Sequence, residues 1–261
     1  MGTFHQAIGA PGARRPARPA RGAHDPRCVT AGACCGEVRG IGAAGSGPRR
    51  CAIALEEAGQ AARHLRRESL SSLAAMARHS PGSFTLSVVD VGTRSLRGAV
   101  AVPGRTRWAI YDGGLDRFFV NIADPPMIVA VAADDPQRLD ATYEMPAVGP
   151  HGLDLDVDTG RLLCAADDGQ FLAVEAATGK TLATVPLSGP PDVIFLDHAL
   201  ARCYVAVGDP GVIDVIDVRA MRRLESVATE PGAHTTALDA DRHLLYVFLP
   251  ETHRAAVFAD A

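Results

Sequence analysis

The stretch "RCYVAVGDPGVIDV", Arg202–Val215, decides how this chain folds. It contains two short runs of β-branched and aromatic residues joined by Gly-Asp-Pro-Gly, which is the pattern of a tight β-hairpin. Similar text occurs three more times in the 261-residue chain. A recurrence of this kind indicates a fold built from one small unit that is used many times.

Four segments align without internal gaps, and they begin at Arg107, His151, Asp192 and His234. The steps between these first residues are 44, 41 and 42. Each segment has an aspartate five residues on, a large apolar residue seven further and an acidic residue five beyond that. A third apolar run follows in all four segments, and a fourth follows in the first three. The pattern predicts four-stranded units of about 42 residues, the size of a β-propeller blade.

The repeats resemble the Tyr-Val-Thr-Asn (YVTN) family of bacterial β-propellers. The resemblance rests on "FFVNIAD", "CYVAVGD", "LYVFLP" and the third-strand text "VIDV", and it covers residues 83–261. Asn121 keeps the asparagine of the signature, whereas the other segments depart from it. The resemblance implies an all-β propeller, with about seven blades in typical members and binding roles. The repeat text supplies about four and a third blades. It begins mid-blade near residue 83 and stops after the third strand of the last blade.

Residues 1–82 have a different composition from the repeats. They carry 12 arginines and 5 acidic residues, whereas residues 83–261 carry 14 basic and 25 acidic residues. This Ala/Arg/Gly/Pro-rich text predicts a disordered or partly helical segment, with an amphipathic helix near 54–79. It is either a flexible basic extension or the product of a shifted reading frame or wrong start. We favour the second interpretation, because such a composition cannot bury a core.

The composition also bears on partners and location. The acidic repeats argue against nucleic acid, because phosphate contacts need clustered lysine and arginine. No window approaches the roughly 18 consecutive apolar residues of a membrane span. The N-terminal text lacks the apolar core of a signal peptide, so the chain as written is predicted to be cytoplasmic. The family resemblance implies a periplasmic or secreted protein if the N-terminus is misassigned.

Strand alternation places polar residues at one end of the central channel. In a four-stranded blade, the turn that enters the innermost strand lies on the same face as the turn between strands two and three. The first residues of the four segments should therefore ring the channel mouth, and we predict that they bind a ligand: Arg107, His151, Asp192 and His234. The aspartates five residues on should lie at the opposite end and accept backbone N–H groups in turns. They are Asp112, Asp156, Asp197 and Asp239.

Two functions stay open at this point. The first is a non-enzymatic binding or scaffold protein whose channel mouth takes a protein or small ligand. The alternative is a metal-dependent enzyme, such as a lactonase-like hydrolase or dehydrogenase subunit, because His151, Asp192 and His234 offer the donors that one divalent metal needs. A third interpretation assigns these residues no ligand at all, because polar residues at strand starts commonly do no more than cap backbone groups. We assign no catalytic residue, and no G-x-S-x-G nucleophile motif occurs.

Overall fold

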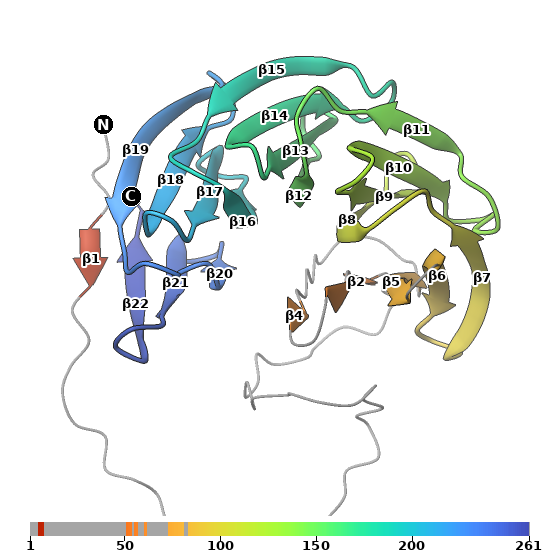
Figure 1. Ribbon diagram of the computed structural model, residues 1–261, viewed down its shortest axis with the longest axis horizontal. Coiled ribbons are helices and arrows are strands. Elements are labelled where there is room, and N and C mark those ends of the chain that lie inside the picture. The colour runs from red at the N-terminus through yellow and green to blue at the C-terminus, as the bar shows by residue number, and fades with distance from the viewer. Residues whose placement is uncertain are drawn as a thin grey trace, which may run out of the picture.

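The chain folds into four-stranded β-sheets, as the repeat predicts. The computed structural model describes residues 5–7, 51–53, 55–56, 60–61, 73–80 and 83–260. Every regular element in these residues is a strand, and five sheets of four strands follow one another around a common centre (Figure 1). None of these elements is a helix long and apolar enough to cross a membrane. The prediction of an all-β propeller is confirmed.

Three central sheets match three of the aligned segments strand for strand, and each runs in chain order from an inner to an outer strand. The second sheet of the series holds β8 (Thr106–Asp112), β9 (Arg117–Ile122), β10 (Met127–Ala132) and β11 (Ala141–Glu144). The third holds β12 (Pro150–Asp156), β13 (Arg161–Ala166), β14 (Gln170–Glu175) and β15 (Thr181–Pro186). The fourth holds β16 (Pro191–Asp197), β17 (Arg202–Val207), β18 (Val212–Asp217) and β19 (Arg222–Ala228).

The middle strands are apolar along their whole length because both of their faces are buried. In β9, Phe118 packs into the core shared with the preceding sheet, and Phe119 packs into the core shared with the following sheet. Successive strand residues point to opposite faces, so a strand between two neighbours needs apolar residues at every position. This explains runs such as "RLLCAA" and "RCYVAV". The outer strand β19, by contrast, is exposed at nearly every residue.

The first and last sheets take strands from the chain before the repeat. The first holds β2 (Cys51–Ile53), β5 (Leu73–Ser80), β6 (Ser83–Asp90) and β7 (Ser95–Ala101). The last holds β20 (Thr236–Asp239), β21 (Leu244–Leu249), β22 (Arg254–Ala259) and β1 (His5–Ala7). A two-stranded sheet is formed by β3 (Leu55–Glu56) and β4 (Gln60–Ala61). The first sheet therefore begins before residue 83, and β1 supplies the fourth strand of the last one.

The predicted helix near 54–79 is wrong where the structure describes these residues, because residues 55–56, 60–61 and 73–79 lie in the strands β3, β4 and β5. Residues 73–80 form β5, which pairs antiparallel with β6 through eight register positions. Without this strand, one edge of β6 would have its backbone N–H and C=O groups unpaired, and pairing outweighs a weak helical pattern. Residues 54, 57–59 and 62–72 lie outside the described residues. The origin of residues 1–82, as an extension or a misread frame, stays a prediction.

Buried carboxylates join neighbouring sheets. Asp154 on β12 accepts the backbone N–H of Leu196 on β16 at 2.8 Å. Asp197, at the end of β16, contacts Nδ1 of His243 in the last sheet at 2.6 Å. Both aspartates are 0% exposed. These contacts hold the inner strands of adjacent sheets in register, which places the strand starts next to one another.

Candidate functional site

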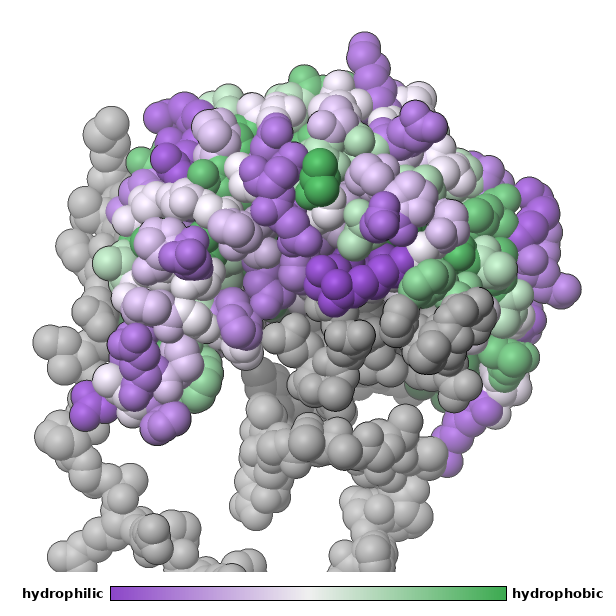
Figure 2. Space-filling view, viewed as in Figure 1, coloured by the Kyte–Doolittle hydropathy of each residue, from purple (hydrophilic) through white to green (hydrophobic). Residues whose placement is uncertain are grey.

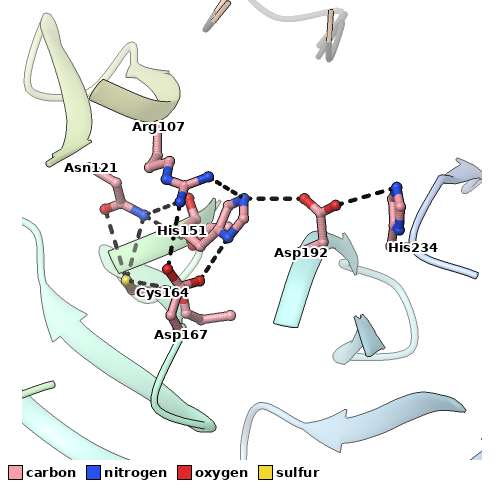
Figure 3. Close-up of polar contacts among 9 residues, drawn as sticks. Arg107, Asn121, His151, Cys164, Asp167, Asp192 and His234 are labelled. Carbon is pink, nitrogen blue, oxygen red and sulfur yellow. Dashed lines mark hydrogen bonds and ion pairs between the residues drawn. The ribbon is translucent and has the colours of Figure 1, made fainter. Parts of the chain in front are cut away.

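The four residues predicted at the channel mouth form one chain of contacts in the structure (Figure 3). Arg107 lies on β8, His151 on β12, Asp192 on β16 and His234 just before β20. Arg107 Nη1 is 3.2 Å from His151 Nε2. His151 Nε2 is also 3.2 Å from Asp192 Oδ1. Asp192 Oδ2 is 3.9 Å from His234 Nε2. Four consecutive sheets thus contribute to a single polar cluster. The space-filling view likewise has a strongly hydrophilic patch toward the inside of the arc (Figure 2).

Bulges at the starts of the inner strands present three of these side chains. The pairing register shifts between Thr106 and Ala109, between Pro150 and Leu153, and between Pro191 and Ile194. Arg107, His151 and Asp192 each lie inside one of these irregular stretches. A bulge re-aims a side chain away from the regular face of its strand. The repeated bulge therefore turns the first residue of these three segments toward its neighbours instead of into the core.

Asp167 belongs to the same cluster and was missed by sequence reasoning. Its Oδ1 accepts a hydrogen bond from His151 Nδ1 at 2.8 Å, and its Oδ2 is 3.6 Å from Arg107 Nη2. The repeat register assigns Asp168 to this turn, but Asp168 accepts the backbone N–H of Val148 at 2.9 Å instead. A signal was present, because the second segment is the one with two consecutive acidic residues at this register.

Asn121 supports the cluster from the adjacent sheet. Its side chain is 0% exposed, and Nδ2 donates to the backbone oxygens of His151 at 2.9 Å and Gly152 at 3.1 Å. The same nitrogen is 3.5 Å from Cys164 Sγ, and burial raises the pKa of this thiol to about 12. Asn121 therefore holds the bulged backbone that carries His151, while Cys164 stays a protonated, unreactive thiol.

The cluster has a closed interior and an open rim. The side chains of Arg107 and His151 are 10% exposed, whereas those of Asp167 and His234 are 38% and 42% exposed. Burial lowers the pKa of His151, but the hydrogen bond to Asp167 and the nearby carboxylate of Asp192 outweigh it and raise the pKa above its usual value. A protonated His151 and Arg107 then balance two carboxylates. A ligand would meet Asp167 and His234 first.

His151 Nε2 faces two groups with opposite requirements. If the ring is protonated on both nitrogens, the positively charged Nε2–H faces the carboxylate oxygen Asp192 Oδ1. If the ring is neutral with its proton on Nδ1, Nε2 instead accepts a hydrogen bond from Arg107 Nη1. Asp192 Oδ1 is buried and receives no aligned hydrogen bond within the described part of the chain, although His151 Nε2 is 3.2 Å away. The raised pKa of His151 favours the first arrangement. The carboxylates of Asp167 and Asp192, one at each ring nitrogen, both favour the protonated ring.

The same geometry argues against a metal ion at His151. Both ring nitrogens already contact carboxylates, and the Arg107 guanidinium lies at the nitrogen that a cation would need. Like charges this close repel each other strongly in a partly buried site. Within the described residues, the group of three potential ligand atoms that lie within 4.8 Å of one another is a different one, Asp156, Asp158 and His198. The cluster at the mouth suits hydrogen bonding and ion pairing better than metal ligation.

The aspartates five residues into each segment are the last residues of the inner strands, where the turns begin. Asp112 Oδ1 accepts the backbone N–H of Gly114 at 2.7 Å, and Asp197 Oδ1 accepts that of Leu200 at 3.2 Å. These are the turn contacts that the sequence predicts. Asp156 differs, because Oδ2 receives hydrogen bonds from two side chains of its own sheet.

Comparison with solved structures defines the class of protein. The chain is similar to the Kuenenia stuttgartiensis hydrazine synthase with a TM-score of 0.62 and 15% identity, over 81% of this chain and 58% of that one. It is similar to the WD40 β-propeller domain of Doa1 with a TM-score of 0.57 and 14% identity, over 71% and 62% of the two chains. For Saccharomyces cerevisiae Sqt1 the TM-score is 0.57 and the identity 5%, over 68% and 52%.

The protein is therefore a β-propeller protein, and identities this low show the fold alone. The chain spans less than two thirds of the length of each of these three neighbours. No protein-family model and no curated protein sequence matches the chain.

We expect the protein to lose stability as the pH rises through the raised pKa of His151. Its folded pKa exceeds the unfolded value of 6.5, so protonation stabilises the fold fully below that value, and the contribution disappears above the folded pKa. Asp167 affects the stability of the protein at low pH. Burial raises its pKa, but the hydrogen bond from His151 lowers it below 3.8, so its contribution is present above that value and is lost as the pH falls.

Urea unfolding at about pH 6 and about pH 8 measures this effect at the upper end. The difference in the free energy of unfolding between the two pH values should be larger for the wild type than for His151→Gln. His253→Gln is a matched control, because His253 is exposed in the turn before β22. An equal pH dependence of the wild type and His151→Gln would show that His151 does not contribute in this way.

Proposed function

We propose that this protein is a non-enzymatic binding protein of the YVTN-repeat type, and that its channel mouth takes a polar ligand. The observation that supports this proposal most strongly is the chain of contacts from Arg107 through His151 and Asp192 to His234, with Asp167 beside it. Its parts come from four sheets, and part-buried contacts hold Arg107, His151 and Asp167 in place before any ligand arrives. A site arranged in advance lowers the entropic cost of binding.

The exposures indicate which groups meet the ligand. Asp167 offers a carboxylate acceptor, and His234 offers an imidazole on the other side of Asp192 (Figure 3). The ligand that fits has a hydrogen-bond donor for Asp167 and an acceptor for His234, as a zwitterionic small molecule or a polar protein loop does. The interior residues Arg107 and His151 then act by positioning these two groups.

The resemblance to YVTN repeats supports this proposal from a second direction. Asn121 keeps the signature asparagine and also holds the backbone of His151. The signature residue and the site are thus parts of one local arrangement. The metal-dependent enzyme considered from the sequence finds less support, because Arg107 and the carboxylates already occupy the coordination positions of His151.

Thermal unfolding of the full chain, in the presence of amino acids, small zwitterions and short polar peptides, tests the proposal. A ligand present at about 100 times its Kd adds about 2.7 kcal/mol to stability and raises the Tm. We expect this shift to disappear in His234→Ala and in Asp167→Asn, whose side chains are partly exposed and whose replacement leaves the core intact. The matched control His253→Ala should keep it.

Two results would contradict the proposal. One is a ligand whose stabilising effect persists unchanged in both His234→Ala and Asp167→Asn. The other is hydrolase or dehydrogenase turnover that requires one bound metal ion per chain and is lost in His151→Ala, because this outcome supports the enzyme instead.

A further inference from the structure

A second cluster of chemically capable side chains lies at the opposite end of the blades from the channel mouth. Asp156 ends β12, Asp158 lies in the turn that follows, and His198 lies in the turn after β16 of the next sheet. One oxygen from each carboxylate and one imidazole nitrogen all lie within 4.8 Å of one another. The cluster therefore bridges two neighbouring sheets.

The repeat does not by itself produce this arrangement. The next segment has Ala199 at the position of Asp158, and the last segment has Ala240 at the position of His198. Asp239 and Asp241 reproduce the Asp-x-Asp spacing in the last sheet, but no histidine from a following segment of the repeat stands beside them. The junction between the third and fourth sheets is the one where this repeat brings two carboxylates and an imidazole together.

The donor set indicates the class of ion. Carboxylate oxygens alone favour calcium or magnesium, whereas an added imidazole favours a borderline divalent ion such as zinc. Asp156 is 6% exposed, and its Oδ2 accepts from Thr159 Oγ1 at 2.5 Å and Arg161 Nη2 at 2.9 Å. These bonds orient the carboxylate, as partners of a ligating carboxylate do.

The local charge is also compatible with a cation. The two carboxylates carry two negative charges, and the guanidinium of Arg161 offsets one of them. One negative charge of the two carboxylates is left for a divalent ion to balance, and the exposed Asp158 opens the cluster to solvent.

We propose that Asp156, Asp158 and His198 bind one divalent transition-metal ion, which joins the turn after β12 to the turn after β16. Such an ion would act as an interblade clamp, and its site is separate from the ligand site at the channel mouth.

Calorimetric titration of the chelator-treated full chain with Zn²⁺ tests this assignment. We expect one bound ion per chain and a higher Tm in its presence. Asp158→Asn and His198→Ala should each weaken binding by more than the roughly 10–100-fold loss that is typical for an outer-shell partner. Asp241→Asn is the matched control, because it changes an exposed aspartate of the same Asp-x-Asp spacing in the last sheet.

Circular dichroism confirms that the variants fold, and Asp158 is exposed, so its amide variant retains the core. The proposal is overturned if Zn²⁺ does not bind, or if Asp158→Asn and His198→Ala bind it as the wild type does. Loss of binding in His234→Ala with retention in Asp158→Asn would also overturn it, because the ion would then occupy the channel mouth.

Discussion

Replacing Phe119 by alanine is expected to lower the free energy of unfolding by about 3–5 kcal/mol. The ring is 0% exposed and belongs to the core between the second and third sheets. It stacks on Tyr143 with ring centroids 6.3 Å apart. Alanine would remove this contact and leave a cavity between two blades that neighbouring strands cannot fill, because their register is held by backbone pairing. Urea unfolding followed by circular dichroism measures the loss.

Phe248→Ala is the matched control for this substitution. Phe248 lies on β21 of the last sheet, and its side chain is 46% exposed. Truncation of an exposed ring should cost no more than about 1 kcal/mol. If both variants lost the same free energy, burial between consecutive blades would not be the source of stability at Phe119.

Asp214→Ala is expected to destabilise the protein by about 1–3 kcal/mol. The carboxylate is 0% exposed in the middle of β18. It accepts from Ser188 N at 2.7 Å, Ser188 Oγ at 2.8 Å and Ser226 Oγ at 2.5 Å, and Arg223 Nη1 is 3.4 Å away. Removing the carboxylate leaves the part-buried N–H of Ser188 without its acceptor, and an unsatisfied donor of this kind costs about 1–3 kcal/mol. The side chains of Ser226 and Arg223 are exposed and can hydrogen-bond to water instead.

Asp214→Asn should be less damaging than the alanine variant, because the amide keeps one oxygen acceptor and the volume of the side chain. Asp134→Ala serves as the control, since Asp134 is exposed in the loop after β10. Equilibrium urea unfolding of the three variants ranks them. A loss in Asp134→Ala as large as that in Asp214→Ala would contradict the buried-network explanation.

Several features of the fold followed from the sequence because they depend on local pairing. A strand and its hairpin partner are close in the chain, and turn residues such as the Gly-Asp-Pro-Gly of residues 208–211 fix where they meet. In-register repeats then imply that equivalent residues occupy equivalent places. This reasoning brought Arg107, His151, Asp192 and His234 to one place, and the structure shows these four in contact.

Prediction from the sequence was wrong or incomplete where strand pairing is neither local nor repeated. The short strand β1 joins β22 from the other end of the chain, and β5 pairs with β6 in a stretch that has a helical pattern. Neither pairing leaves a periodic signal, because each occurs once. The helix was predicted from an isolated segment, and the open edge of β6 decided the outcome instead.

What the sequence determined by itself is therefore the all-β repeat, the length of each blade and the end of the blades at which the polar residues gather. The tertiary structure alone decided which groups touch. It placed Asp167 and not Asp168 against His151, and it brought His198 beside Asp156 from the next sheet. The physical reason is that spacing along the chain sets the position of a backbone. The bulges and the packing between blades set the direction of each side chain to within the few ångströms that hydrogen bonding requires.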